Sequence, residues 1–135
     1  PLMSRPFFDT NTLLYLISED SAKADKVERL LLSRGVISVQ VLNEFTNIAQ
    51  RKHILPLQRI RPFLQALRDA CEVVPLTLEI HDTGLDLVDR YRFSIYDAMI
   101  ISAALHHGCD TVLSEDMQSG MSVLGKLEIR NPFLG

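Results

Sequence analysis

Short apolar runs alternate along the chain with longer stretches in which apolar positions recur every three or four residues. The runs predict buried strands and the stretches predict helices, because the two elements repeat their side-chain directions with different periods. We expect strands at residues 5–8, 36–39, 72–75 and 111–113, with a fifth, edge strand at 127–129. Helices are expected at residues 11–17, 21–32, 40–52, 56–70, 77–91 and 94–107.

This alternation predicts the α/β class, as a three-layer α/β/α sandwich around a parallel sheet of four or five strands. Gly35 and Gly108 are expected to end the helices that precede them. The 135 residues match the usual size of one domain, so we expect a single domain over 1–135. Pro1 and Leu2 precede Met3, which we expect to be the natural first residue.

The composition is that of an ordinary globular protein, with 47% hydrophobic and 23% charged residues. The longest apolar run, over 98–105, is far shorter than the roughly 18–20 residues of a membrane span. Arg5 and Asp9 stand too close together for the apolar centre of a signal peptide, so we expect a cytoplasmic protein that does not use a membrane. Cys71 and Cys109 lack CxxC spacing and are predicted to be reduced core residues.

Four acids lie just past predicted strands or in the helices that follow: Asp9, Glu44, Asp97 and Asp116. Ligands of open α/β sheets bind beyond these strand ends. Carboxylates within several Å of one another oppose each other's ionisation unless a cation neutralises them, and hard oxygen ligands suit Mg²⁺ or Mn²⁺. The pattern therefore indicates a divalent-metal site and a metal-dependent nuclease.

Each of these acids also has a purely structural interpretation. Asp9 suits a helix N-cap, Asp97 suits a capping box with Ser94, Glu44 suits a boundary salt bridge and Asp116 suits a turn. For Asp97 the structural interpretation is weakened, because the helix after it is apolar nearly all round and must be buried. An acid in such surroundings needs a cation.

Other charged residues fit a solvated surface better than a site. Glu79, Asp82, Asp86 and Asp89 share one arc of a predicted helix, which is typical of an exposed acidic face. The four histidines form no ligand pair and are expected to be structural.

Seven scattered basic residues fit phosphate contacts and a solvated surface equally well, namely Arg51, Lys52, Arg59, Arg61, Arg68, Arg90 and Arg92. The net charge of −3 becomes +1 without the four candidate acids, so it does not exclude RNA or DNA.

Taken together, four short segments resemble the PIN domain family, and the chain length resembles its VapC-like toxin ribonucleases. The segments are 7–11, 43–44, 96–98 and 113–116, which read FFDTN, NE, YDA and LSED. The resemblance implies that Asp9, Glu44, Asp97 and Asp116 are the catalytic, metal-binding residues, and that Thr10, Asn11 and Ser114 support them. It also implies hydrolysis of RNA phosphodiester bonds with Mg²⁺ or Mn²⁺.

The same resemblance implies a homodimer and a separately encoded antitoxin that covers the site. One apolar stripe is a candidate for antitoxin docking, although such a stripe also fits a core face. It consists of Leu13, Leu14, Leu16, Val27, Leu30 and Leu31.

Three other functions remain to be compared with a ribonuclease. A receiver-type phosphoacceptor would carry paired acids after the first strand and a lysine after the last. A phosphatase that forms an aspartyl-phosphate would carry Asp-x-Asp where this chain has Asp9-Thr10-Asn11. The alternative that stays open is a non-catalytic PIN module that binds RNA or a protein partner, although this chain keeps all four acids.

Overall fold

The computed structural model describes residues 5–134, and its centre is a six-stranded sheet in the order β3-β2-β1-β4-β6-β5. The expected start at Met3 lies outside the described residues. All neighbouring strands are parallel except β5, which runs antiparallel to β6. The strands are β1 (Phe7–Phe8), β2 (Gly35–Ser38), β3 (Cys71–Val74), β4 (Thr111–Leu113), β5 (Ser122–Val123) and β6 (Leu127–Arg130).

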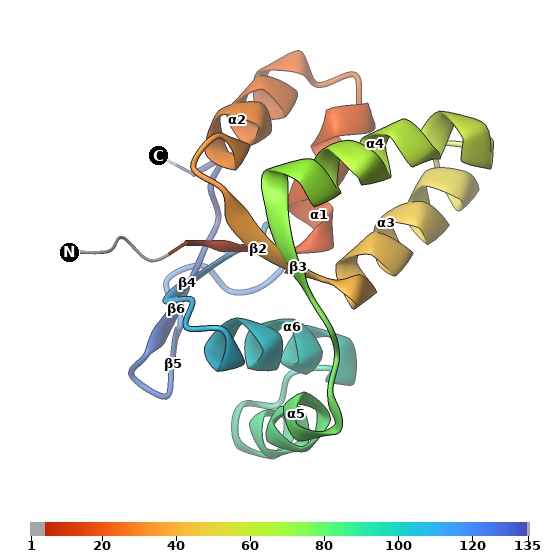
Figure 1. The fold of residues 1–135 in the computed structure, drawn as a ribbon. Helices are drawn as coiled ribbons and strands as arrows, with labels where there is room; N and C mark the ends of the chain where they lie inside the picture. The colour runs from red at the N-terminus through yellow and green to blue at the C-terminus, as the bar shows by residue number, and fades with distance from the viewer. Residues whose placement is uncertain (1–4, 135) are drawn as a thin grey trace.

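Helices cover both faces of this sheet (Figure 1). On one side lie α1 (Thr10–Leu13), the 3-10 helix η1 (Leu14–Ile17), α2 (Ser21–Leu31), α3 (Val39–Arg51) and α4 (Leu57–Ala70). On the other side lie α5 (Leu78–Tyr91) and α6 (Ile95–His106). The expected three-layer α/β/α class is therefore confirmed. None of the described helices has the length and apolarity that a membrane crossing requires.

The sheet differs from the expectation in its number of strands and in its edge. It has six strands rather than four or five, and the antiparallel β5, not β6, forms the edge beyond β4. β5 is only two residues long, which is too short to show an alternating pattern. The helix expected over 11–17 is also divided into α1 and the tighter η1.

Gly35 has a different role from the one expected. The left-handed residue after α2 is Arg34, with φ of 55°, and Gly35 opens β2 instead. A Cβ atom on Gly35 would lie 2.3 Å from Cε2 of the Phe8 ring, so glycine is needed for the close contact between β1 and β2. Gly108 has φ of 72° just beyond the end of α6, as expected.

The core lies between the sheet and both helix layers. Phe7, Phe8 and Phe45 are fully buried, and α6 is buried from Ala98 to Ala104, as its uniformly apolar sequence predicts. Cys71 and Cys109 are buried free thiols, which confirms that prediction. The stripe considered for antitoxin docking belongs to this core: Leu13 and Val27 are fully buried, and Leu14, Leu16, Leu30 and Leu31 pack partly against it.

The strand order reverses at β1, and we call the space beyond the carboxyl ends of β1 and β4 the crevice. From β1 the chain continues to β2 on one side, whereas β4 pairs with β1 on the other. Such a reversal of strand order is where open α/β sheets bind ligands. Asp9 directly follows β1 and its backbone N–H donates to the carbonyl of Leu113, 2.9 Å away. Residues about a hundred positions apart in sequence therefore meet at this crevice.

Candidate active site

Asp9 is the most buried of the four candidate acids, with 7% of its surface exposed. Its Oδ1 accepts from the backbone N–H of Thr10 at 2.7 Å, so Asp9 is the N-cap of α1. Its Oδ2 accepts from Ser114 Oγ at 2.8 Å and from Asn11 Nδ2 at 3.1 Å. Burial raises the pKa of Asp9 to about 6; the hydrogen bonds from Ser114 and Thr10 oppose this rise, and the charges of Asp97 and Glu44 add to it.

Glu44 reaches the same edge of the sheet from α3. Its Oε1 accepts from Thr10 Oγ1 at 3.0 Å and from Gln40 Nε2 at 3.4 Å. Thr10 therefore connects the N-terminus of α1 to Glu44. The salt bridge that would explain Glu44 structurally is not among the ion pairs of the described residues.

The other two candidate acids, Asp97 and Asp116, interact electrostatically with each other. Asp97 is half-buried in the first turn of α6, where its backbone N–H donates to the N-cap Ser94 Oγ at 3.1 Å. Burial raises the pKa of Asp97, and the nearby charge of Asp116 raises it further, whereas a hydrogen bond with Ser94 lowers it. Asp116 is exposed, two residues after the buried Ser114.

The four acids are electrostatic neighbours without forming a closed ligand cage. Within residues 5–134, no three His, Cys, Asp or Glu side chains are close enough together to hold one ion as they stand. In the same part of the chain, no basic side chain forms an ion pair with any of the four. Ser38 Oγ, at the carboxyl end of β2, is buried and has no hydrogen-bond partner among the described residues. An oxygen-only donor set of this kind fits Mg²⁺ or Mn²⁺.

Asn11 and Ser114 hold the two strand ends together. The Asn11 side chain donates to Asp9 and to Ser114 Oγ, 3.2 Å away, and its Oδ1 accepts from the backbone N–H of Glu115 at 3.0 Å. Ser114 Oγ also accepts from the backbone N–H of Met117 at 3.2 Å. The three predicted supporting residues, Thr10, Asn11 and Ser114, thus all contact a candidate acid.

Comparisons with known proteins identify the family of the chain. A family model described as "PIN domain" matches residues 7–119. The chain belongs to the PIN domain family. No curated protein sequence gives a significant match to this PIN domain.

Solved structures show the same fold at low sequence identity. A toxin-antitoxin complex from Klebsiella pneumoniae is similar with a TM-score of 0.73 and 22% identity, over 95% of this chain and 98% of that one. DNA-bound VapBC from Salmonella typhimurium gives 0.72 and 20%, over 96% and 99%. VapC20 from Mycobacterium tuberculosis, described as a sarcin-ricin loop cleaving toxin, gives 0.66 and 20%, over 82% and 91%.

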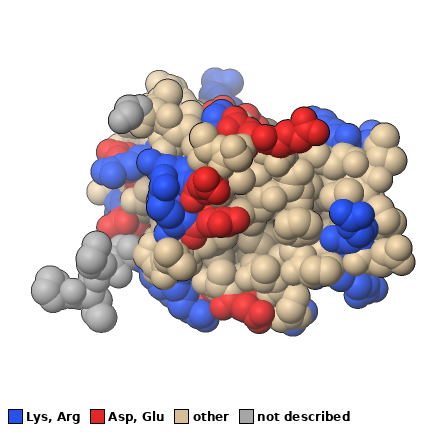
Figure 2. Space-filling model, turned by 90° about the horizontal axis from the view of Figure 1, so that it is seen from above, with Lys and Arg blue, Asp and Glu red and all other residues tan. Residues whose placement is uncertain are grey.

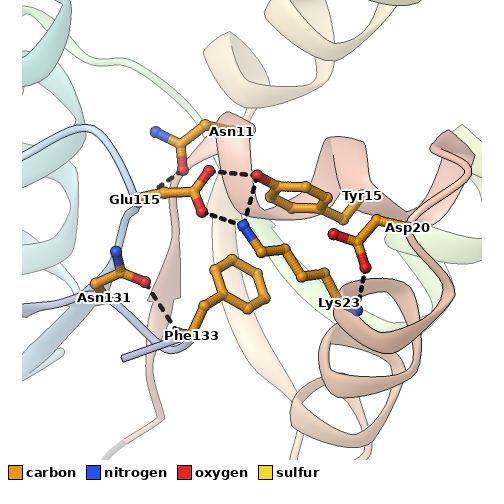
Figure 3. A network of polar contacts seen from close by, with 7 residues as sticks. All are labelled: Asn11, Tyr15, Asp20, Lys23, Glu115, Asn131 and Phe133. Carbon is orange, nitrogen blue, oxygen red and sulfur yellow. Dashed lines mark hydrogen bonds and ion pairs between the residues drawn. The ribbon is translucent and has the colours of Figure 1, made fainter. Parts of the chain in front are cut away.

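Near the candidate acids, the structure shows contacts among Tyr15, Lys23 and Glu115 that the sequence did not indicate (Figure 3). The Tyr15 hydroxyl donates to Glu115 Oε1, and Lys23 Nζ contacts Glu115 Oε2 at 2.8 Å. The hydrogen bond from Lys23, and after it the hydrogen bond from Tyr15, hold the pKa of Glu115 below its usual value. Because the contacts span 92 and 100 residues of sequence, no local pattern in this PIN domain reveals them.

Two hollows flank the acids of this PIN domain. A groove of about 550 Å³ beside Glu44 is lined by exposed apolar side chains, Val39, Leu76 and Tyr96 among them, and by amides. A second hollow of about 290 Å³ lies beside Asp116, with Lys52 and His53 in its wall. On the face in Figure 2, acidic and basic side chains lie close to one another beside a broad area that carries neither.

Proposed function

We propose that this PIN domain is a metal-dependent endoribonuclease in which Asp9, Glu44, Asp97 and Asp116 bind Mg²⁺ or Mn²⁺. The observation that carries the proposal is the state of Asp9. It is buried at the crevice between β1 and β4, and burial and the neighbouring carboxylates raise its pKa to about 6. A divalent cation would favour the ionised carboxylates that this environment otherwise disfavours.

The residues around the acids have separate tasks in this proposal. Asn11 and Ser114 hold the Asp9 carboxylate through hydrogen bonds to Oδ2, and Thr10 orients Glu44. Asp116 is exposed, so it faces the side from which RNA approaches. When bound, the ion would lower the pKa of a water and offset negative charge on the phosphate.

RNA is the substrate class that we infer. Lys52 and His53 line the hollow beside Asp116, so a phosphate next to the one being cleaved would meet positive charge or a hydrogen-bond donor there. VapC20, which has the same fold, is described as cleaving the sarcin-ricin loop, an RNA element. We propose that this protein acts likewise on RNA in the cytoplasm, as the toxin of a toxin-antitoxin pair.

A separately encoded antitoxin and a second copy of the chain are the proposed protein partners. The Klebsiella structure is a toxin-antitoxin complex, and the Salmonella structure is a VapBC complex.

The groove beside Glu44 is the proposed dimer contact, because Val39, Leu76 and Tyr96 expose 44%, 41% and 66% of their surfaces there. Leu76→Glu should give monomers in light scattering. The control Leu32→Glu, at a position that is also exposed, should remain a dimer. An unchanged dimer in Leu76→Glu would exclude this contact.

The decisive experiment measures cleavage of end-labelled tRNA, linear RNA and single-stranded DNA by the partner-free protein. Each substrate is incubated with Mn²⁺, Mg²⁺ or EDTA, and Mn²⁺ binding is measured in parallel by calorimetry. Metal-dependent cuts in RNA that are absent with EDTA would support the nuclease. Mn²⁺ binding without cleavage of any substrate would favour the non-catalytic PIN module, and cleavage in EDTA would exclude the metal mechanism.

A further inference from the structure

Tyr15, Lys23 and Glu115 form a polar cluster next to the candidate acids, which we name the brace (Figure 3). Glu115 receives a hydrogen bond from the Tyr15 hydroxyl on one carboxylate oxygen and pairs with Lys23 Nζ on the other. Lys23 Nζ also donates to the Tyr15 hydroxyl at 3.2 Å. All three side chains therefore contact one another, which fixes the Glu115 carboxylate from two directions.

The C-terminal segment covers the brace. The Phe133 ring meets the edge of the Tyr15 ring with centroids 5.0 Å apart, and Lys23 Nζ lies 4.7 Å from the Tyr15 centroid and 5.0 Å from that of Phe133. Phe133 is held in turn by its backbone N–H, which donates to Asn131 Oδ1 at 2.9 Å. The side chains of Lys23 and Glu115 keep only 34% and 26% of their surface exposed, unlike an ordinary surface ion pair.

The brace is connected to the candidate acids through the backbone of Glu115. That backbone N–H donates to Asn11 Oδ1, and Asn11 Nδ2 donates to Asp9 Oδ2. On either side of Glu115 stand Ser114, which donates to Asp9, and Asp116, whose charge acts on Asp97. Holding Glu115 at its side chain and at its backbone therefore restricts the whole segment 114–116.

We propose that Tyr15 and Lys23 are positioning residues, which hold Glu115 and thereby set Asp116 opposite Asp97 for metal binding. The inference rests on the proposed metal site. Neither residue is expected to touch the ion or the RNA through this contact. Their effect passes through Glu115 to the orientation of Asp116, as the groups around a ligand tune metal affinity in other sites.

The test compares two glutamates that each form one ion pair at opposite ends of the sheet. Glu115→Gln weakens the brace, whereas Glu72→Gln weakens the Arg5–Glu72 pair near the amino ends of β1 and β3. Lys23→Met removes the cation of the brace and Lys23→Arg keeps it. Two quantities are measured for each: hydrogen exchange of the Glu115 and Met117 amides without metal, and Mn²⁺ affinity by calorimetry.

We expect Glu115→Gln and Lys23→Met to speed exchange of both amides by about tenfold. Both should weaken Mn²⁺ binding by roughly three- to tenfold, below the 10- to 100-fold effect of a group that contacts a ligand directly. Lys23→Arg should restore both quantities, and Glu72→Gln should change neither. These results together would support the brace as a positioning element.

The remaining outcomes each overturn a different statement. Unchanged amide exchange in Lys23→Met would show that the brace does not hold segment 114–116. Faster exchange with unchanged Mn²⁺ affinity would leave the brace as a structural contact with no role in the site. No Mn²⁺ binding by the unmodified protein would overturn the proposed metal site, and with it the role of the brace there.

Discussion

Two groups of four acids, each with one glutamate and three aspartates, differ in how the chain brings their members together. Asp9, Glu44, Asp97 and Asp116 come from four separate segments that the fold brings to the carboxyl ends of β1 and β4. The other four lie on the single helix α5 and are all exposed. These are Glu79, Asp82, Asp86 and Asp89.

The difference between the groups lies in solvation. Burial and mutual charge raise the pKa of Asp9 and of Asp97. On α5 all four acids are exposed, and salt screens charges that are separated along an exposed helix. Acids therefore indicate a site when the fold brings them together from distant segments and buries some of them. The number of acids, or their spacing along the sequence, does not by itself indicate a site.

The largest expected effect separates one member of each group. Asp97→Asn should lower metal-dependent RNA cleavage by more than about 100-fold. The loss of a metal ligand should reduce activity more than the loss of a group that only hydrogen-bonds a ligand. The fold should be retained, since the backbone N–H of residue 97 still donates to Ser94 Oγ. Cleavage of end-labelled RNA and far-UV circular dichroism check the two statements.

Asp82→Asn on α5 is the matched control, with the same chemical change at an exposed position. It should leave cleavage within about twofold of the unmodified protein. Equal losses in the two variants would remove the distinction between the groups, and undiminished cleavage by Asp97→Asn would remove Asp97 from the mechanism.

The second effect is a pH dependence of stability in the metal-free protein, and it comes from Asp9. Its pKa of about 6 in the folded protein exceeds the ordinary value of 3.8, so the folded state binds the proton more tightly than the unfolded state does. This contribution to the free energy of unfolding is fully present below about pH 4 and is lost as the pH rises through about 6. The loss amounts to about 3 kcal/mol.

Urea unfolding between pH 4 and pH 7, in EDTA, measures this contribution as the difference between the unmodified protein and Asp9→Asn. The free energy of unfolding of the unmodified protein minus that of Asp9→Asn should fall as the pH rises. The free energies of unfolding of Asp82→Asn and the unmodified protein should instead change with pH in parallel. Parallel curves for all three proteins would mean that folding does not change the ionisation of Asp9.

Sequence patterns predicted the layers of the fold because its longer elements carry strong signals. The uniformly apolar sequence of α6 predicts its burial, and the β-branched residues of β2 predict that strand. The strand β5 was missed since two residues carry no alternation, and Gly35 was misassigned because its role is to make room for Phe8, a contact between distant residues.

The candidate acids were visible in the sequence because each stands next to an element whose type could be predicted. Their partners were less visible. Tyr15 and Lys23 contact Glu115 across 100 and 92 residues, and the groove at Val39, Leu76 and Tyr96 is assembled from three separate segments. Such contacts follow from how the elements pack, which periodicity within one segment does not specify.

The third effect concerns the hydroxyl of Ser114, which donates a hydrogen bond to Asp9. Ser114→Ala removes the hydrogen bond from Ser114 Oγ to Asp9 Oδ2, which lowers the pKa of Asp9 in the unmodified protein. The pKa should therefore rise further, and Mn²⁺ affinity near pH 6 should fall by about tenfold. Calorimetry checks this, with the exposed Ser122→Ala on β5 as the control. Equal Mn²⁺ affinities of Ser114→Ala and Ser122→Ala would contradict this expectation.

The smallest effect has the opposite sign and belongs to α5. Asp82 lies three residues after Glu79 and four before Asp86, so like charges flank it on the helix surface. Asp82→Asn should therefore raise the free energy of unfolding by about 0.2–0.5 kcal/mol at low salt. This gain should disappear in 1 M NaCl, where the screening length is roughly 3 Å. Because the four acids of α5 are exposed, Mn²⁺ at about millimolar concentration should stabilise Asp82→Asn as much as the unmodified protein. If Asp82→Asn lost that stabilisation, the ion would bind on α5, and burial would not be what distinguishes the two groups of acids.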